Sequence, residues 1–197
     1  ADDVINASEA GGTVAVTGTT GGELTEGDSV SFTVNGTDYS ATVAADGSWS
    51  ADVAGSDLAA DTAFTVTATG TDDASNPISA TADSTHSVDT TGTGTVTVDS
   101  ITADDVINAS EAGGTVAVTG TTGGELAEGD SVSFTVNGTD YSATVAADGS
   151  WSADVAGSDL AADTAFTVTA TGTDDAGNPI SATADSTHSV DTTGTGT

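Results

Sequence analysis

Residues 30–41 read VSFTVNGTDYSA, and this stretch decides the fold. Apolar and polar side chains alternate on both sides of Asn35-Gly36, which is the pattern of strands with one buried face. An Asn-Gly pair between two alternating runs predicts a type I′ turn, because both residues tolerate a positive φ. A two-residue turn places Phe32 opposite Tyr39, and the neighbouring apolar residues then follow in register on the same face. The stretch therefore predicts a β-hairpin.

Other alternating runs surround this hairpin, and no segment shows helical periodicity over a useful length. If the strands that follow Tyr39 are neighbours, a three-residue loop at 45–47 places Val43 opposite Trp49. Gly47 then supplies the left-handed residue of a bulge. The remaining strand signals lie at 14–16, 49–53, 64–68 and 78–88.

About seven short strands per 100 residues, with turn signals between them, predict an all-β fold of Ig-like Greek-key β-sandwiches. The antibody Cys…Trp…Cys signature is missing, so the prediction concerns the architecture alone. Inward-facing positions of the second repeat predict a core rich in Val. This core comprises Val96, Val98, Val116, Val118, Val132, Phe134, Val136, Tyr141, Val145, Trp151, Val155, Leu160, Phe166, Val168 and Ile180.

The chain is a tandem repeat. Residues 103–197 repeat residues 1–95 and differ from them only at Thr25 against Ala127 and Ser75 against Gly177. A repeat of this length is a domain rather than a solenoid unit, so we expect an Ig-like domain at 1–91 and a second at 92–197. A Gly/Thr tether at 90–94 is flexible by composition. The run 95–101 either opens the second domain, so that the first lacks its first strand, or closes the first.

Charge and cysteine content exclude several classes of partner. The chain carries 31 Asp and Glu residues and no Lys or Arg, for a formal charge of −31. Nucleic acid and anionic membrane are disfavoured partners, since both require basic residues. Cysteine is absent, which leaves metal ions as the available cross-link. No apolar run approaches the length of a membrane span and no signal peptide is present, so we expect targeting to lie outside this segment.

The acidic residues cluster in predicted loops, which indicates Ca²⁺ sites. Ca²⁺ takes six to eight oxygen ligands from carboxylates, amides and backbone carbonyls. Halophilic solvation is the rival explanation for the acidic residues. It would use Glu as well as Asp, but Glu supplies only six of the 31 acidic residues. The candidate ligands are Asp2, Asp3, Asn6, Glu9, Asp57, Asp61, Asp72, Asp73, Asn76, Asp89, Asp99, Asp104, Asp105, Asn108, Glu111, Asp148, Asp159, Asp163, Asp174, Asp175, Asn178 and Asp191.

Catalytic patterns are weak. His86 and His188 share the parity of the apolar residues in their strand, which favours a half-buried rim position over a ligand. Ser, His and Asp occur together near residues 83–89, but residues on one strand cannot converge as a triad. A glycosidase with paired carboxylates requires a cleft, which units this small do not indicate. We therefore expect no enzyme and no catalytic residues.

Four segments, taken in the order of their positions within the repeat, resemble the bacterial Ig-like extender repeats of giant RTX adhesins: GSWSADV (47–53), TVTATGTDDAGNP (167–179, in the second copy), SVDTTGTGTVTVDSI (87–101) and ADDVINASEA (103–112). The resemblance covers both repeats. It implies calcium bound within and between modules, identical neighbouring repeats as partners, and an extracellular place on a bacterial surface. The expected function is a calcium-rigidified spacer that projects a distal adhesive domain outside this segment. The alternatives are a module that binds glycan or ice, and a halophilic repeat without specific calcium sites.

Overall fold

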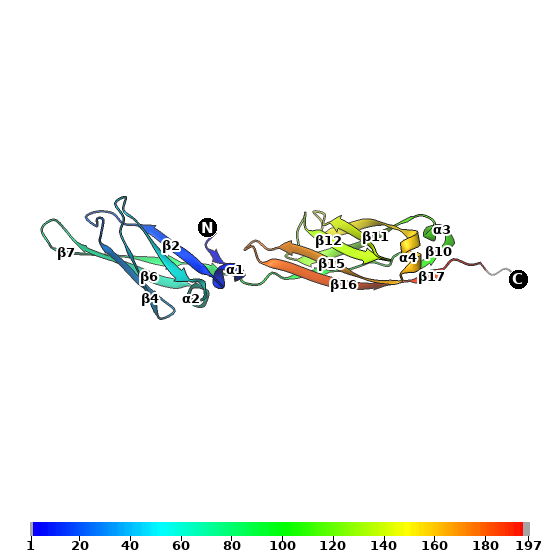
Figure 1. Ribbon diagram of the computed structural model, residues 1–197, viewed down its shortest axis with the longest axis horizontal. Coiled ribbons are helices and arrows are strands. Elements are labelled where there is room, and N and C mark those ends of the chain that lie inside the picture. Colours follow the sequence, from blue (N-terminus) through cyan, green and yellow to red (C-terminus); the bar gives the residue numbers. More distant parts are fainter. Residues whose placement is uncertain (1, 195–197) are drawn as a thin grey trace. The chain divides into compact units, whose positions relative to one another are not determined.

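The computed structural model describes residues 2–194, and the chain divides into two compact units, Ala1–Thr90 and Thr91–Thr197. We call them unit 1 and unit 2. In each unit the strands form a β-sandwich, and the short helices lie at one end of the strands (Figure 1). The predicted all-β, Ig-like architecture is confirmed.

Unit 1 contains a four-stranded sheet in the order β4-β3-β6-β7, which faces the pair β2-β5. A short parallel pair, β1-β8, joins the N-terminal and C-terminal segments of the unit. The bounds of its elements are β1 Val4–Ile5, α1 Ala7–Ala10, β2 Thr13–Thr19, β3 Ser29–Val34, β4 Thr37–Thr42, β5 Ser48–Ala54, α2 Gly55–Ala60, β6 Ala63–Thr71, β7 Pro77–Thr85 and β8 Ser87–Val88.

Unit 2 repeats this arrangement with one addition. Its four-stranded sheet is β13-β12-β15-β16, and its second sheet has three strands, β14-β11-β9, because β9 pairs with the far edge of β11. Its elements are β9 Gly94–Val96, β10 Val106–Asn108, α3 Ala109–Ala112, β11 Thr115–Gly124, β12 Ser131–Val136, β13 Thr139–Thr144, β14 Ser150–Ala156, α4 Gly157–Ala162, β15 Ala165–Thr173, β16 Pro179–Thr187 and β17 Ser189–Asp191.

The central hairpin has the predicted register. Phe32 pairs with Tyr39 across β3 and β4. Asn35 and Gly36 have φ angles of 50° and 78°, as a type I′ turn requires. The rings of Phe32 and Tyr39 stack with their centroids 5.8 Å apart. Local turn chemistry and the alternation of side chains therefore set this part of the sheet.

The predicted pairing of Val43 with Trp49 is wrong. The Ala44 N–H donates to the Ser48 carbonyl at 2.8 Å, and this tight turn carries the chain out of the first sheet. Strand β5 then pairs with β2 in the opposite sheet, where Trp49 lies across from Gly18. Gly47 does adopt the predicted left-handed conformation, with φ 80°. The prediction of Gly47 as the left-handed turn residue is confirmed, but the next strand was assigned to the wrong sheet.

The sequence analysis also missed the short helices. Helix α2 covers only Gly55–Ala60, which is too short to show a helical period. Its Leu58 is 2% exposed and closes the core at that end of unit 1. In the described part of the chain, no helix has the length and apolar character needed to cross a bilayer.

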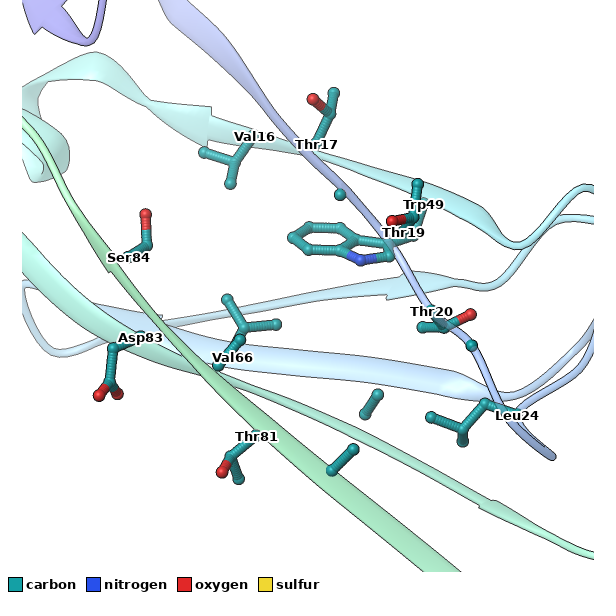
Figure 2. Close-up of a pocket in the computed structure, with 15 residues that line it drawn as sticks. Val16, Thr17, Thr19, Thr20, Leu24, Trp49, Val66, Thr81, Asp83 and Ser84 are labelled. Atoms are coloured by element: carbon teal, nitrogen blue, oxygen red, sulfur yellow. The ribbon is translucent and has the colours of Figure 1, made fainter.

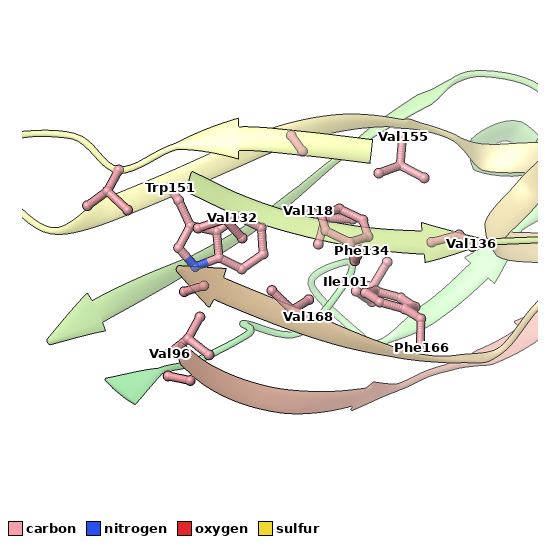
Figure 3. Close-up of a cluster of buried hydrophobic side chains, with 14 of the residues drawn as sticks. Val96, Ile101, Val118, Val132, Phe134, Val136, Trp151, Val155, Phe166 and Val168 are labelled. Atoms are coloured by element: carbon pink, nitrogen blue, oxygen red, sulfur yellow. The ribbon is translucent and has the colours of Figure 1, made fainter. Parts of the chain in front are cut away.

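The predicted core of unit 2 is confirmed, with Val98 and Tyr141 at its partly buried margin. Figure 3 shows how Val132, Phe134 and Val168 gather between the two sheets. The sequence analysis overlooked several members of this core. They are Ile101, Ile107, Leu126, Ala153, Ala170 and Ala182.

Candidate metal sites

Two pairs of candidate ligands cap short helices. The Asn6 Oδ1 accepts a hydrogen bond from the Glu9 N–H at 3.0 Å, and the Glu9 Oε2 accepts one from the Asn6 N–H at 3.1 Å. Asn108 and Glu111 form the same capping box at α3. These oxygens satisfy N–H groups that a helix end leaves unpaired. The Asn-x-x-Glu spacing was a visible signal for this structural role.

The aspartates before these helices hold the entering loop. The Asp104 Oδ1 accepts from the Thr102 hydroxyl at 2.9 Å, which lowers the pKa of Asp104. The Asp105 Oδ1 accepts from the Ile101 N–H at 3.0 Å. Asp105 and its counterpart Asp3 have φ angles of 59° and 64°, which aspartate tolerates better than most residues. Within residues 2–194, the carboxylates of this loop do not gather three together within 4.8 Å.

A second set of candidates anchors the central hairpin. The Asp57 carboxylate accepts from the Tyr39 hydroxyl at 2.6 Å and from the Asn35 side-chain amide at 3.1 Å. The Asp61 carboxylate accepts from the Asn35 N–H at 3.0 Å. The Tyr39 hydroxyl, and after it the amide of Asn35, lower the pKa of Asp57. Unit 2 repeats these contacts with Asp159 and Asp163.

The loop between the last two long strands folds around an aspartate in both units. In unit 2, the Asp174 carboxylate accepts from the N–H of Asn178 at 2.7 Å and from its side-chain amide at 2.8 Å. Asp72 and Asn76 make the same contacts in unit 1. The side-chain amide of the asparagine is the main cause that lowers the pKa of Asp72 and of Asp174. Asp174 is only 8% exposed, whereas Asp72 is half-buried.

Glu125, which the sequence analysis did not name as a ligand, lies beside this loop in unit 2. One carboxylate oxygen of Glu125 comes within 4.8 Å of one of Asp174. The Glu125 Oε2 also accepts from the Thr93 N–H at 2.6 Å and from its hydroxyl at 2.9 Å. Residues 125 and 174 belong to different turns. Tracing the strands of a sandwich predicts that both turns lie at the same end of unit 2, but no local pattern predicts that these two carboxylates meet.

The Gly/Thr tether contacts unit 2 at Gly92, Thr93 and Gly94. Besides the Glu125 contact of Thr93, its glycines pack closely against neighbours. A Cβ placed on Gly92 would lie 2.8 Å from the Ile180 side chain, and one on Gly94 would lie 2.9 Å from the Leu126 side chain. Composition predicts a flexible tether, and in the structure its glycines make close contacts with unit 2 that a larger residue would not permit.

The remaining candidates are scattered. The carboxylates of Asp99, Asp148 and Asp191 accept from the side chain of Thr119, from Ser150 and from Thr193. Asp73 and Asp175 are exposed, and Asp2 accepts from the Val4 N–H at 3.3 Å. Asp89 is half-buried, and its N–H donates to the Ile5 carbonyl at 3.0 Å.

The two histidines lie at equivalent places with different burial. Each ring lies with its Nε2 2.8 Å from a backbone carbonyl oxygen, that of Leu58 for His86 and that of Leu160 for His188. His86 is half-buried, as predicted, whereas His188 is 8% exposed and its Nδ1 is buried without a hydrogen-bond partner. Neither belongs to a group of three metal-ligating side chains in the described part of the chain.

Comparison with solved structures identifies close relatives. A Ca²⁺-stabilised adhesin that helps an Antarctic bacterium reach out and bind ice is 61% identical, with a TM-score of 0.86 over 98% of this chain and 48% of that one. A 1.5-MDa bacterial ice-binding adhesin is 54% identical, with a TM-score of 0.90 over 98% of this chain and 62% of that one. This chain thus spans less than two thirds of either structure.

A single bacterial immunoglobulin-like domain from the M. primoryensis ice-binding adhesin is 61% identical and is matched over 97% of its length, which corresponds to 51% of this chain, with a TM-score of 0.47. No protein-family model and no curated protein matches the chain.

Proposed function

Because the chain belongs to the family of bacterial Ig-like extender repeats of giant RTX adhesins, we propose that its units are calcium-stabilised spacers. Such repeats would hold a distal adhesive domain, outside this segment, away from a bacterial surface. We further propose that one repeat ends and the next begins at residues 91 and 92, that neighbouring repeats are the partners, and that the modules have no catalytic activity.

The observation that carries the calcium proposal is the burial of Asp174. This carboxylate is 8% exposed, the two groups of Asn178 that donate to it are neutral, and the chain contains no Lys or Arg to pair with it. Its pKa is lowered, so it is ionised at neutral pH. The carboxylate of Glu125 lies within 4.8 Å of the Asp174 carboxylate, and two carboxylates so close together repel each other unless a cation lies between them.

The donors at this place fit Ca²⁺. Hard cations of this kind bind carboxylate and carbonyl oxygens at about 2.3–2.6 Å, so two oxygens on one ion lie up to roughly 5 Å apart. The separation of at most 4.8 Å between Glu125 and Asp174 satisfies this condition. Backbone carbonyls and water would complete the six to eight ligands. The other donors named from the sequence remain proposed ligands, and those in capping boxes are the weaker candidates.

An ion held here would also act on the tether. Glu125 binds the backbone N–H and the hydroxyl of Thr93, so fixing Glu125 fixes Thr93. The glycines on either side of Thr93 already pack on Ile180 and Leu126. Calcium would therefore stiffen the start of unit 2 as well as stabilise its fold, which is the property that a spacer needs.

Thermal unfolding in calcium and in chelator tests the proposal. A bound ion whose free concentration is 100 times its Kd stabilises the folded state by about 2.7 kcal/mol. Asp174→Asn and Glu125→Gln should each remove most of the calcium-dependent rise in the Tm of unit 2. Glu128→Gln, which removes one charge from an exposed position of the loop that follows β11, is the matched control.

Amide exchange at Gly92 and Gly94 gives a second readout of the same experiment. Calcium should slow exchange in the parent chain and in Glu128→Gln, but not in Asp174→Asn. Equal melting in calcium and in chelator would refute the proposal. Full recovery in chelator by NaCl alone would favour the halophilic explanation instead.

A further inference from the structure

Two of the six asparagines of the chain precede glycine, and each lies at the tip of the central hairpin of its unit. Asn35 and Asn137 are exposed and both have a φ of 50°. Gly36 and Gly138 follow with φ angles of 78° and 77°. A Cβ placed on either glycine would meet no atom within 4 Å apart from its chain neighbours. The peptide nitrogen that follows each of these asparagines therefore has open surroundings.

An asparagine and a glycine in this arrangement can react with each other. The peptide nitrogen of Gly36 loses its proton to solvent and attacks the side-chain carbonyl carbon of Asn35, which closes a succinimide ring and releases ammonia. Water then opens the ring at either carbonyl and leaves an aspartate or an isoaspartate. The net change is one water consumed and one ammonia released, so the side-chain amide becomes a carboxylate. Glycine favours the attack because it has no side chain beside the nitrogen.

The other four asparagines lack this combination. Asn76 and Asn178 precede proline, which has no N–H to supply the attacking nitrogen. Asn6 and Asn108 precede alanine and cap short helices, with their side-chain oxygens accepting backbone N–H groups. A capping side chain is held by the helix end. The reactive pairs are therefore the two at the hairpin tips.

Two carboxylates hold the reactive asparagine of unit 1. The side-chain nitrogen of Asn35 donates to the Asp57 Oδ1 at 3.1 Å, and its backbone N–H donates to the Asp61 Oδ2 at 3.0 Å. A side-chain amide held in this way is less free to turn toward the next peptide nitrogen. Release from Asp57 through local opening of the hairpin tip therefore controls how often the two atoms meet.

Deamidation would remove this anchor. The product carboxylate has no N–H to donate, and it takes the place of an amide that lies 3.1 Å from Asp57, so like charges face each other. The isoaspartate product also lengthens the backbone by one carbon atom, which the geometry of a two-residue type I′ turn excludes. Either product therefore detaches the tip of the β3–β4 hairpin from helix α2.

We propose that Asn35 and Asn137 are sites of self-deamidation, and that this slow covalent change loosens each unit at its central hairpin. Asp57 and Asp159 set the rate, because they hold the side-chain amide until the tip opens. The contacts are the same in both units, so the change would recur once in every repeat of an array. The reaction requires no cation and is independent of the calcium proposal.

Mass spectrometry of the full chain after incubation in a mildly alkaline buffer tests the proposal. The chain has no Lys or Arg, so an endoproteinase specific for acidic residues prepares the peptides. We expect the mass gain of deamidation at Asn35 and Asn137 before it is detectable at Asn6 or Asn108. A synthetic peptide of residues 31–40 verifies that the conditions allow the reaction. Unmodified hairpin tips after the peptide has reacted completely, or equal reaction at Asn6, would overturn the proposal.

Asp57→Ala tests the role of the anchor within one molecule. It releases Asn35 but leaves Asn137 held by Asp159, so unit 2 is the internal control. The two sites should react equally in the parent chain, whereas Asn35 should react roughly threefold to tenfold faster in the variant, since the lost hydrogen bond is a charged but exposed one.

Val43→Ala is the control for a general loss of stability, because Val43 is 1% exposed in the core and has no contact with Asn35. Circular dichroism verifies that both variants stay folded. Equal rates at Asn35 and Asn137 in Asp57→Ala, or the same acceleration in Val43→Ala, would overturn the assignment of Asp57.

Asn35→Asp reproduces one product and measures the loosening. Urea unfolding of unit 1, followed through Trp49 in a Trp151→Phe chain, should have a lower midpoint than in the parent. Asn35→Gly removes the same donor without adding a charge and keeps a residue that the turn accepts, so its midpoint should lie between the two. An Asn35→Asp midpoint equal to that of the parent would overturn the proposal that deamidation loosens the unit.

Discussion

Replacing Ile180 and Ile78 by alanine should destabilise the two units unequally, although both residues occupy the same position of the repeat. Ile180 is 2% exposed and lies beneath the tether, where Gly92 and Gly94 approach its side chain. Ile78 is only half-buried, because none of the described strands of unit 1 covers this place. The two variants therefore remove the same atoms from different surroundings.

The magnitude follows from burial. Truncating a fully buried Ile to Ala costs about 2–5 kcal/mol, which combines the lost transfer free energy with that of the cavity. Ile180→Ala should lie within this range and lower the Tm of unit 2 by roughly 10–20 °C. The Ile78 side chain is already partly exposed to water, and its truncation to Ala leaves no closed cavity. We therefore expect less than about half of that loss of stability.

Urea unfolding measures the two losses separately if each chain keeps a single Trp. Trp151→Phe leaves Trp49 to report on unit 1, and Trp49→Phe leaves Trp151 to report on unit 2. Each Ile variant is compared with its own single-Trp parent. Equal losses in the two units would refute the argument, because the difference in burial would then be absent in solution.

Three further predictions concern turns, charges and caps. Gly36→Val should cost about 1–2 kcal/mol in urea unfolding, because its φ of 78° is strained for a β-branched residue; unchanged stability would contradict the type I′ turn. Tyr39→Phe removes the hydroxyl that lowers the pKa of Asp57, so carbon NMR should show this carboxyl titrating at higher pH. Because the folded-state pKa of Asp57 is lowered, the stability that the hydroxyl adds is present above the usual pKa of 3.8 and is lost as the pH falls through the folded value. If the free energies of unfolding of parent and variant differed by the same amount at about pH 6 and at about pH 3, this reasoning would be wrong. Asn108→Ala should cost about 1 kcal/mol in thermal melts with calcium and with chelator alike, as a lost helix cap does. A loss confined to calcium would instead make Asn108 a ligand, and Ser110→Ala is the control.

Features that depend on neighbours in the chain were predictable from the sequence. The register of β3 and β4 follows from a two-residue turn, because so short a loop leaves the chain one way to reverse. The Val-rich core follows from alternation, since each strand has one buried face. The relation to adhesin repeats was likewise readable from the order of four segments.

The choice of sheet for β5 was not predictable from the sequence, because the turn at Gly47 fits two neighbouring strands as well as it fits a crossing to the other sheet. The contacts of Glu125 with Asp174 and with Thr93 depend on segments far apart in the chain. The inward face of the sheets is the clearest case, since Val16, Trp49 and Val66 line an open hollow in unit 1 (Figure 2), whereas their counterparts Val118, Trp151 and Val168 lie in the core of unit 2. Alternation determines which side chains face inward, but burial is a property of all the segments that pack together. Only the tertiary structure therefore decides whether an inward face is covered.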